Sequence, residues 1–136
     1  MKAQVATEYL IVVAFALMIL IPYIIYLQGV SQNFAEDNSL FLASSSVTKL
    51  GETVDWVYSQ GEPAQQKILI YIPNNVVSIS LVNRTITWRV STSSGVSDIY
   101  YNSLATLTGN LPTSYGYYYV LVQAESGMVN ISVSPS

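Results

Sequence analysis

The chain has 136 residues, of which 51% are hydrophobic and only 10% are charged, whereas charged residues make up about 25% of an ordinary soluble protein. Eight acidic residues against five basic ones give a net charge of −3, which argues against nucleic acid as the primary partner because nucleic-acid binders gather Lys and Arg against phosphates. The chain contains no His and no Cys, so it lacks the commonest general base, the commonest transition-metal ligand and any thiolate. We therefore expect no catalytic residues, no metal site and no cofactor, and an enzyme is the least favoured class.

A long N-terminal helix is predicted over residues 4–62, and its first part, residues 4–27, is a hydrophobic rod. Within the rod, residues 9–27 read YLIVVAFALMILIPYIIYL and carry no charge. As a helix this run would be about 28 Å long, close to the hydrocarbon thickness of a bilayer. Because it is apolar on every face, it must be surrounded by lipid or protein. Pro22 removes one helical hydrogen bond, so we expect a kink or local melting near residues 18–22.

The second part of the predicted helix, residues 28–62, is amphipathic. Apolar residues recur there at alternating spacings of three and four positions, which places them on one helical face: Leu40, Ala43, Val47, Leu50, Val54 and Val57. Gly29 and Gly51 each weaken helix propensity by about 1 kcal/mol relative to Ala, so the helix could break there. The sequence QGEP at 60–63 ends the pattern, because Pro disfavours helix in the residue before it. The apolar face is expected to pack on the chain's own β-domain or to form a helix–helix seam with other copies of the chain.

Residues 64–136 predict a β-rich globular domain. Side chains alternate with a period of two over residues 68–72, 77–81, 85–90 and 129–134, which is typical of half-buried strands. Turn signals separate these segments: PNN at 73, VNR at 82, SSG at 93, TGNLPTSYG from 108 and SG at 126. We expect about six or seven short strands in a small antiparallel β-sandwich-like domain. The predicted fold class is therefore α+β, a long N-terminal hydrophobic α-helix followed by this domain.

The sequence YGYYYV at 115–120 clusters four tyrosines, Tyr115, Tyr117, Tyr118 and Tyr119. Such a cluster can stack on sugars or contact a partner subunit. Tyr is also a strong strand former whose ring covers a core while its hydroxyl stays in water. This structural interpretation is the one we favour.

Two short motifs match the N-glycosylation sequon, Asn83-Arg84-Thr85 and Asn130-Ile131-Ser132. Asn83 and Asn130 are therefore candidate glycosylation sites. Asn130 alternates with Val129 and Ile131, so its side chain should face outward from its strand.

Three interpretations compete for the N-terminal residues. A secretory signal peptide has an apolar region of about 7–15 residues, which is shorter than the run at 9–27, and the following QGVSQNF makes a poor cleavage site. A membrane anchor fits the length, and Lys2 before the run with Glu36 and Asp37 after it predicts the N-terminus inside the cell and the domain outside. Neither interpretation requires Glu8, although an acid in a first helical turn gains about 0.3–1 kcal/mol from the helix dipole.

The third interpretation uses the whole stretch AQVATEYLIVV at 3–13. It resembles the processing site of archaeal type IV-like pilins, whose class III signal peptide is a short basic leader cut just before Gln in the pattern Gln-any-Ser-any-Glu, followed by an apolar helix. By this resemblance residues 1–3 are the leader and cleavage falls between Ala3 and Gln4. Glu8 then becomes the fifth residue of the mature chain, the position at which these pilins carry glutamate, while Ala6 stands where the family prefers Ser.

The resemblance implies that a prepilin peptidase removes the leader and that the chain sits in the cytoplasmic membrane before assembly. An ATPase-driven pilus assembly machinery would then build it into a helical homopolymer on the cell surface. Cleavage would create an α-amine at Gln4, one helical turn from Glu8, and the two charges would pair within a subunit or between subunits. The leading hypothesis is therefore a structural subunit of an extracellular adhesion pilus. The alternatives are a membrane-anchored monomeric binding module or minor pilin, and third, an archaellum (swimming filament) subunit.

Overall fold

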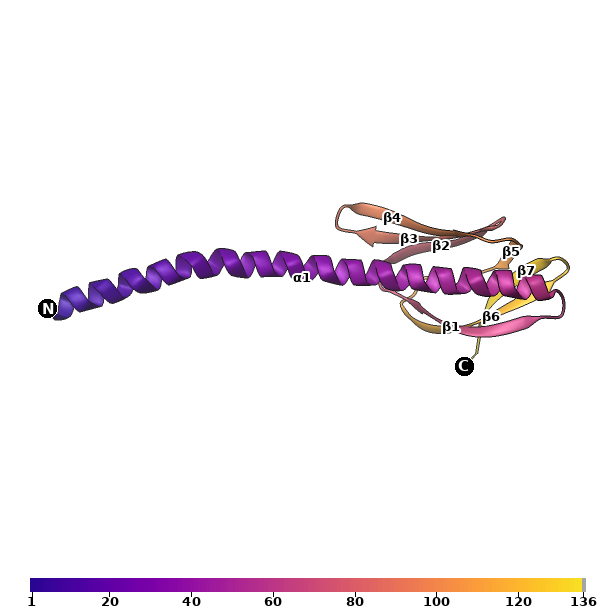
Figure 1. Ribbon diagram of the computed structural model, residues 1–136, viewed down its shortest axis with the longest axis horizontal. Helices are drawn as coiled ribbons and strands as arrows, with labels where there is room; N and C mark the ends of the chain where they lie inside the picture. Colours follow the sequence, from indigo (N-terminus) through magenta and orange to yellow (C-terminus); the bar gives the residue numbers. More distant parts are fainter. Residues whose placement is uncertain (136) are drawn as a thin grey trace. The chain divides into compact units, whose positions relative to one another are not determined.

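The computed structural model describes residues 1–135, and it consists of one helix followed by seven strands (Figure 1). The elements in chain order are α1 (Lys2–Gln60), β1 (Gln65–Ile72), β2 (Val76–Val82), β3 (Thr85–Thr92), β4 (Gly95–Asn102), β5 (Thr106–Gly109), β6 (Gly116–Glu125) and β7 (Met128–Ser134). A long N-terminal helix followed by a mostly antiparallel β-domain is the α+β fold class expected from the sequence.

The chain divides into two compact units, Met1–Glu36 and Asp37–Ser136. The first unit is the N-terminal part of α1. The second contains the rest of α1 together with all seven strands. The amphipathic part of the helix therefore belongs largely with the β-domain.

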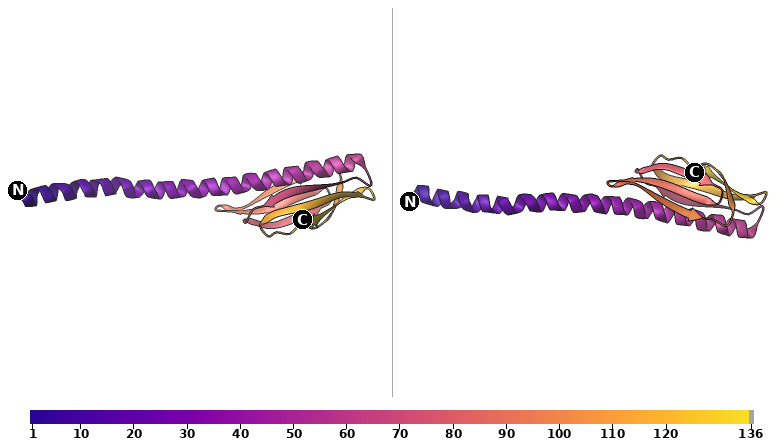
Figure 2. Two further views of the ribbon diagram at one scale, coloured as in Figure 1. Left: turned by 90° about the horizontal axis from the view of Figure 1, so that it is seen from below. Right: turned by 90° about the horizontal axis from the view of Figure 1, so that it is seen from above.

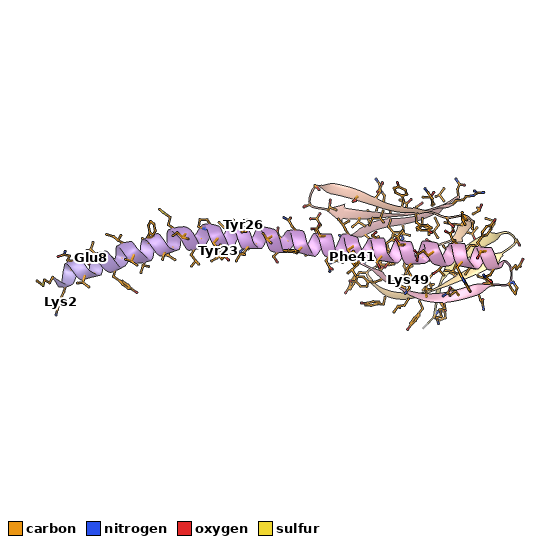
Figure 3. All side chains as sticks on the ribbon, viewed as in Figure 1. Lys2, Glu8, Tyr23, Tyr26, Phe41 and Lys49 are labelled. Atoms are coloured by element: carbon orange, nitrogen blue, oxygen red, sulfur yellow. The ribbon has the colours of Figure 1, made fainter. Side chains whose placement is uncertain are left out.

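Helix α1 is continuous over 59 residues. Neither Gly29 nor Gly51 interrupts it, and it runs through Pro22 without local melting. Figure 3 shows a gentle bend in the segment that carries Tyr23 and Tyr26. The missing hydrogen bond at Pro22 is tolerated because the turns on both sides keep theirs, so the proline bends the helix rather than ending it.

The C-terminus of α1 lies at Gln60, two positions before the predicted end at residue 62. Gly61 follows with φ of 76°, and its amide donates to the carbonyls of Val57 and Tyr58, both at 3.2 Å. A glycine in the left-handed region is a common helix C-cap because it has no Cβ to clash.

The strands form two sheets, a four-stranded sheet in the order β1-β6-β7-β5 and a three-stranded sheet in the order β2-β3-β4. Neighbouring strands are antiparallel except β5 and β7, which pair in parallel. The exception arises because β5 and β6 run in opposite directions but are not neighbours, since β7 lies between them. A strand that is antiparallel to β6 must therefore be parallel to β5. Strand β7 then returns from β6 through the turn at 126–127 and fills the position between them. The antiparallel arrangement expected from the sequence holds for every pair but this one.

A single core lies between α1 and the inner faces of the two sheets. The helix contributes its predicted apolar face, in which one residue is half-buried and the others are buried: Leu40, Ala43, Val47, Leu50, Val54 and Val57. The strands contribute alternate residues, and Trp88 on β3 is completely buried among them. Full burial of a large aliphatic side chain stabilises by about 1.5–3 kcal/mol. Packing of this helical face on the chain's own strands is thus confirmed, and both views of Figure 2 show the strands along one side of this part of the helix.

Asp55 on α1 anchors the end of β4. Its carboxylate accepts hydrogen bonds from the hydroxyl of Tyr101 (2.8 Å), the hydroxyl of Ser103 (2.8 Å) and the amide of Leu104 (2.9 Å). Burial and the hydrogen bond to Asp55 raise the pKa of Tyr101 to about 12. The ring of Tyr101 lies against the backbone of Gly51, so the glycine that the sequence marks as a weak point of the helix is a point of close approach between helix and strand.

Candidate assembly segment and outer surface

The first candidate site is the exposed hydrophobic rod in the first unit. Within residues 9–27 every side chain is exposed except that of Val13, which is half-buried. An 18-residue window of the helix has a mean hydropathy of 2.8 and none of it is buried, so α1 is long and apolar enough to cross a membrane by length and composition. Soluble monomers rarely expose apolar patches of this size. The rod therefore needs lipid or other protein around it.

Gln4 and Glu8 lie at the N-terminal end of this rod. Both side chains are exposed, and they are one helical turn apart on the same side of α1, as the sequence spacing predicted. Figure 3 shows Lys2 and Glu8 near the N-terminus of the helix. Among residues 1–135, Glu8 has no ion-pair partner. The peptide bond between Ala3 and Gln4 lies in the first helical turn, where the hydroxyl of Thr7 donates to the carbonyl of Ala3 at 2.8 Å.

The tyrosine cluster divides between the surface and the core. Tyr118 is half-buried and packs against the core, so the structural interpretation is confirmed for this residue. Tyr115, Tyr117 and Tyr119 are exposed by 72%, 72% and 42%, which leaves them available for a surface contact. Tyr117 lies opposite Tyr71 of β1, and their ring centroids are 4.8 Å apart at an interplanar angle of 47°.

Side chains of α1 cover the free edge of β1. The Ser46 hydroxyl donates to the carbonyl of Tyr71 (2.7 Å) and accepts from its amide (3.2 Å), and the Lys49 ammonium donates to the carbonyl of Leu69 (2.9 Å). An uncovered edge strand is a template for unwanted pairing with another chain. Sequence reasoning missed these two residues. The sequence feature that could have indicated this contact is Ser46, a polar residue directly beside the predicted apolar stripe.

The two glycosylation candidates occupy different settings. Asn83 is exposed in the turn between β2 and β3 with φ of 53°, in the left-handed region that Asn tolerates. Asn130 lies within β7, flanked by Gln123 of β6 and Thr108 of β5. It is half-buried and alternates with the buried Val129 and Ile131, so it faces the outer side of the sheet as predicted.

In the part of the chain that the structure describes, no three His, Cys, Asp or Glu side chains are grouped so that they could hold a metal ion. The fold and the exposed segment define an α+β protein with a long apolar helix at its N-terminus. Comparison with known protein families, curated proteins and solved structures gives no match.

Proposed function

We propose that the chain is a pilin, the structural subunit of an extracellular pilus-like adhesion filament that polymerises through its N-terminal hydrophobic rod. The observation that carries the proposal is the exposed, uncharged helical run at 9–27, preceded by Gln4 and Glu8 at its N-terminal end. A rod that is apolar on every face suits two successive surroundings, the bilayer before assembly and neighbouring rods afterwards.

Processing gives Glu8 a role that a simple membrane anchor lacks. Cleavage between Ala3 and Gln4 by a prepilin peptidase would leave an α-amine, largely cationic at neutral pH because its reference pKa is about 7.7–8.0. In a bundle of apolar rods that amine needs a counter-charge, since breaking a buried ion pair costs about 3–5 kcal/mol. Glu8 is the acid placed to supply it, within its own chain or across to a neighbour.

The test combines N-terminal sequencing of the exported protein with electron microscopy. We expect the mature chain to start at Gln4 and purified material to form filaments. Glu8→Ala and Glu8→Gln should each lower filament yield by at least about tenfold, while the fluorescence of the buried Trp88 shows that the β-domain stays folded. The matched control is Glu125→Ala, at an exposed acid far along the chain, which should assemble normally. An N-terminus intact at Met1, or cut after the rod, would refute the processing step.

A second candidate is a monomeric binding module on a membrane anchor, or a minor pilin, and the exposed tyrosines of β6 favour it. Microscopy separates the two, because a monomeric module gives dispersed detergent-soluble particles instead of filaments. An archaellum subunit would also form filaments. Loss of swimming on deletion of the chain would favour the archaellum over the adhesion pilus.

A further inference from the structure

A hollow of about 290 Å³ lies in the second unit between α1 and the edge strand β1. Ser45 and Lys49 line it from the helix, and Tyr71 and Tyr117 line it from β1 and β6. Figure 3 shows Lys49 on the length of α1 that runs past β1. Pockets for small molecules have volumes of about 300–1,000 Å³, so this hollow suits one ring of a longer ligand.

An aromatic shelf extends the hollow along the outer face of β6. Tyr117 and Tyr119 are two positions apart on this strand, so both rings lie on the same face. Leu69 and Tyr71 lie opposite them on β1. On the neighbouring β7 the small hydroxyl residue Ser134 lies opposite Tyr119. Directly across the strands, the exposed rings therefore face an apolar side chain, Leu69, and two hydroxyls, those of Tyr71 and Ser134.

Two of the chain's few cations flank these tyrosines. The Lys49 ammonium donates one hydrogen bond to the carbonyl of Leu69. Because an ammonium has three N–H donors, it can still bind a ligand. The Lys67 ammonium lies 4.9 Å from the ring centroid of Tyr119 at the other end of the shelf. No carboxylate lines the hollow in the described chain. Glu52 lies instead, together with Lys49, in an adjoining hollow along α1.

We propose that the hollow and the shelf bind an acidic polysaccharide. One sugar ring would stack on Tyr117 with its carboxylate or sulfate on Lys49, and the polymer would continue along β6 past Tyr119 towards Lys67. Aromatic rings accept the apolar faces of sugars while hydroxyls and cations take their polar edges. The uncharged rod of a second copy would instead require an apolar groove without exposed lysines. The inference goes beyond the proposed function and does not depend on filament formation.

The test uses the full-length chain in micelles of a polyoxyethylene detergent, which has no sugar headgroup to compete. The probe is an oligomer of galacturonic acid, and a neutral galactose oligomer of the same length is the reference ligand. We expect calorimetry to show at least about tenfold tighter binding of the acidic oligomer, and this preference should weaken as the salt concentration rises. Tyr117→Ser, Lys49→Gln and Lys67→Gln should each weaken binding several-fold.

Matched controls lie on the other sheet. Tyr100 on β4 is exposed by 67%, a fraction similar to the 72% of Tyr117. Arg84 is an exposed cation in the turn between β2 and β3. Tyr100→Ser and Arg84→Gln should leave binding unchanged. Absence of binding, equal binding of the neutral oligomer, or equal losses in the control variants would each overturn the proposal. Loss of filaments in Tyr117→Ser without any saccharide binding would assign the face to contacts between copies instead.

Discussion

Gly51→Ala should destabilise the second unit by about 1.5–5 kcal/mol. A Cβ at position 51 would meet the ring of Tyr101, and moving the ring by such overpacking costs about 1–3 kcal/mol. The movement would also break the hydrogen bond (2.8 Å) from the Tyr101 hydroxyl to Asp55, which contributes about 1.5–3 kcal/mol because its acceptor is charged. The opposing gain in helix propensity is only about 1 kcal/mol.

The assay is urea unfolding of the full-length chain in detergent micelles, followed by tryptophan fluorescence. The chain has two tryptophans, and replacing the exposed Trp56 by Phe in every variant leaves the buried Trp88 as the reporter. Gly29→Ala is the matched control, because nothing lies within 4 Å of a Cβ at that position. It should leave the unfolding free energy of the β-domain unchanged.

A double-mutant cycle decides whether the ring is the cause. In a Tyr101→Ala background the space beside the helix is open, so Gly51→Ala should become stabilising by about 1 kcal/mol, the ordinary gain in propensity. The reasoning is refuted if Gly51→Ala destabilises by the same amount in both backgrounds.

Two further predictions concern the same contact. Asp55→Ala should lower the free energy of unfolding by about 2–4 kcal/mol because three hydrogen bonds lose their acceptor, and Asp55→Asn should cost about half as much because an amide oxygen can still accept from Ser103 and Leu104. Equal losses in the two variants in urea unfolding would contradict this. The pKa of Tyr101 is raised from 10.0 to about 12, so as the pH rises through this window the unfolded chain loses a proton that the folded chain keeps, and stability falls. Thermal melts should show that Tyr101→Phe removes this part of the pH dependence, and a difference between the two proteins that is constant from neutral pH through this window would contradict it.

Much of the fold is predictable from local periodicity. The stripe from Leu40 to Val57 repeats at helical spacing, and the alternation in β1 and β3 places inward and outward residues correctly, because burial of one face dictates both patterns. In β7 the alternation holds as far as Ile131, whereas Val133 near the end of the strand is exposed by 41%. Strand β4 was harder to recognise because none of its residues is fully buried. The parallel pairing of β5 with β7 could not be predicted, since it depends on which strand fills a position between two others.

The candidate surface is less predictable, because it joins residues from separate elements. Alternation alone separates Tyr118, which faces the core, from Tyr117 and Tyr119, which face outward. Nothing in the local sequence says that Lys49 of the helix meets the edge of β1 beside those rings. Composition likewise marks Gly51 as a weak helical residue, and only the distant Tyr101 gives it a structural reason.

Polar contacts of α1 within the second unit hold residues 37–60 against the strands. Strand β1 is an edge of the four-stranded sheet and β4 is an edge of the three-stranded sheet. Ser46 and Lys49 cover the first edge, and Asp55 holds the end of the second through Tyr101. Releasing residues 37–60 from the strands would expose the edge of β1 and the core and would free the end of β4. This segment therefore belongs structurally to the β-domain. In the first unit the side chains of residues 9–27 are exposed apart from that of Val13, so the assembly that we propose would use this hydrophobic rod rather than residues 37–60.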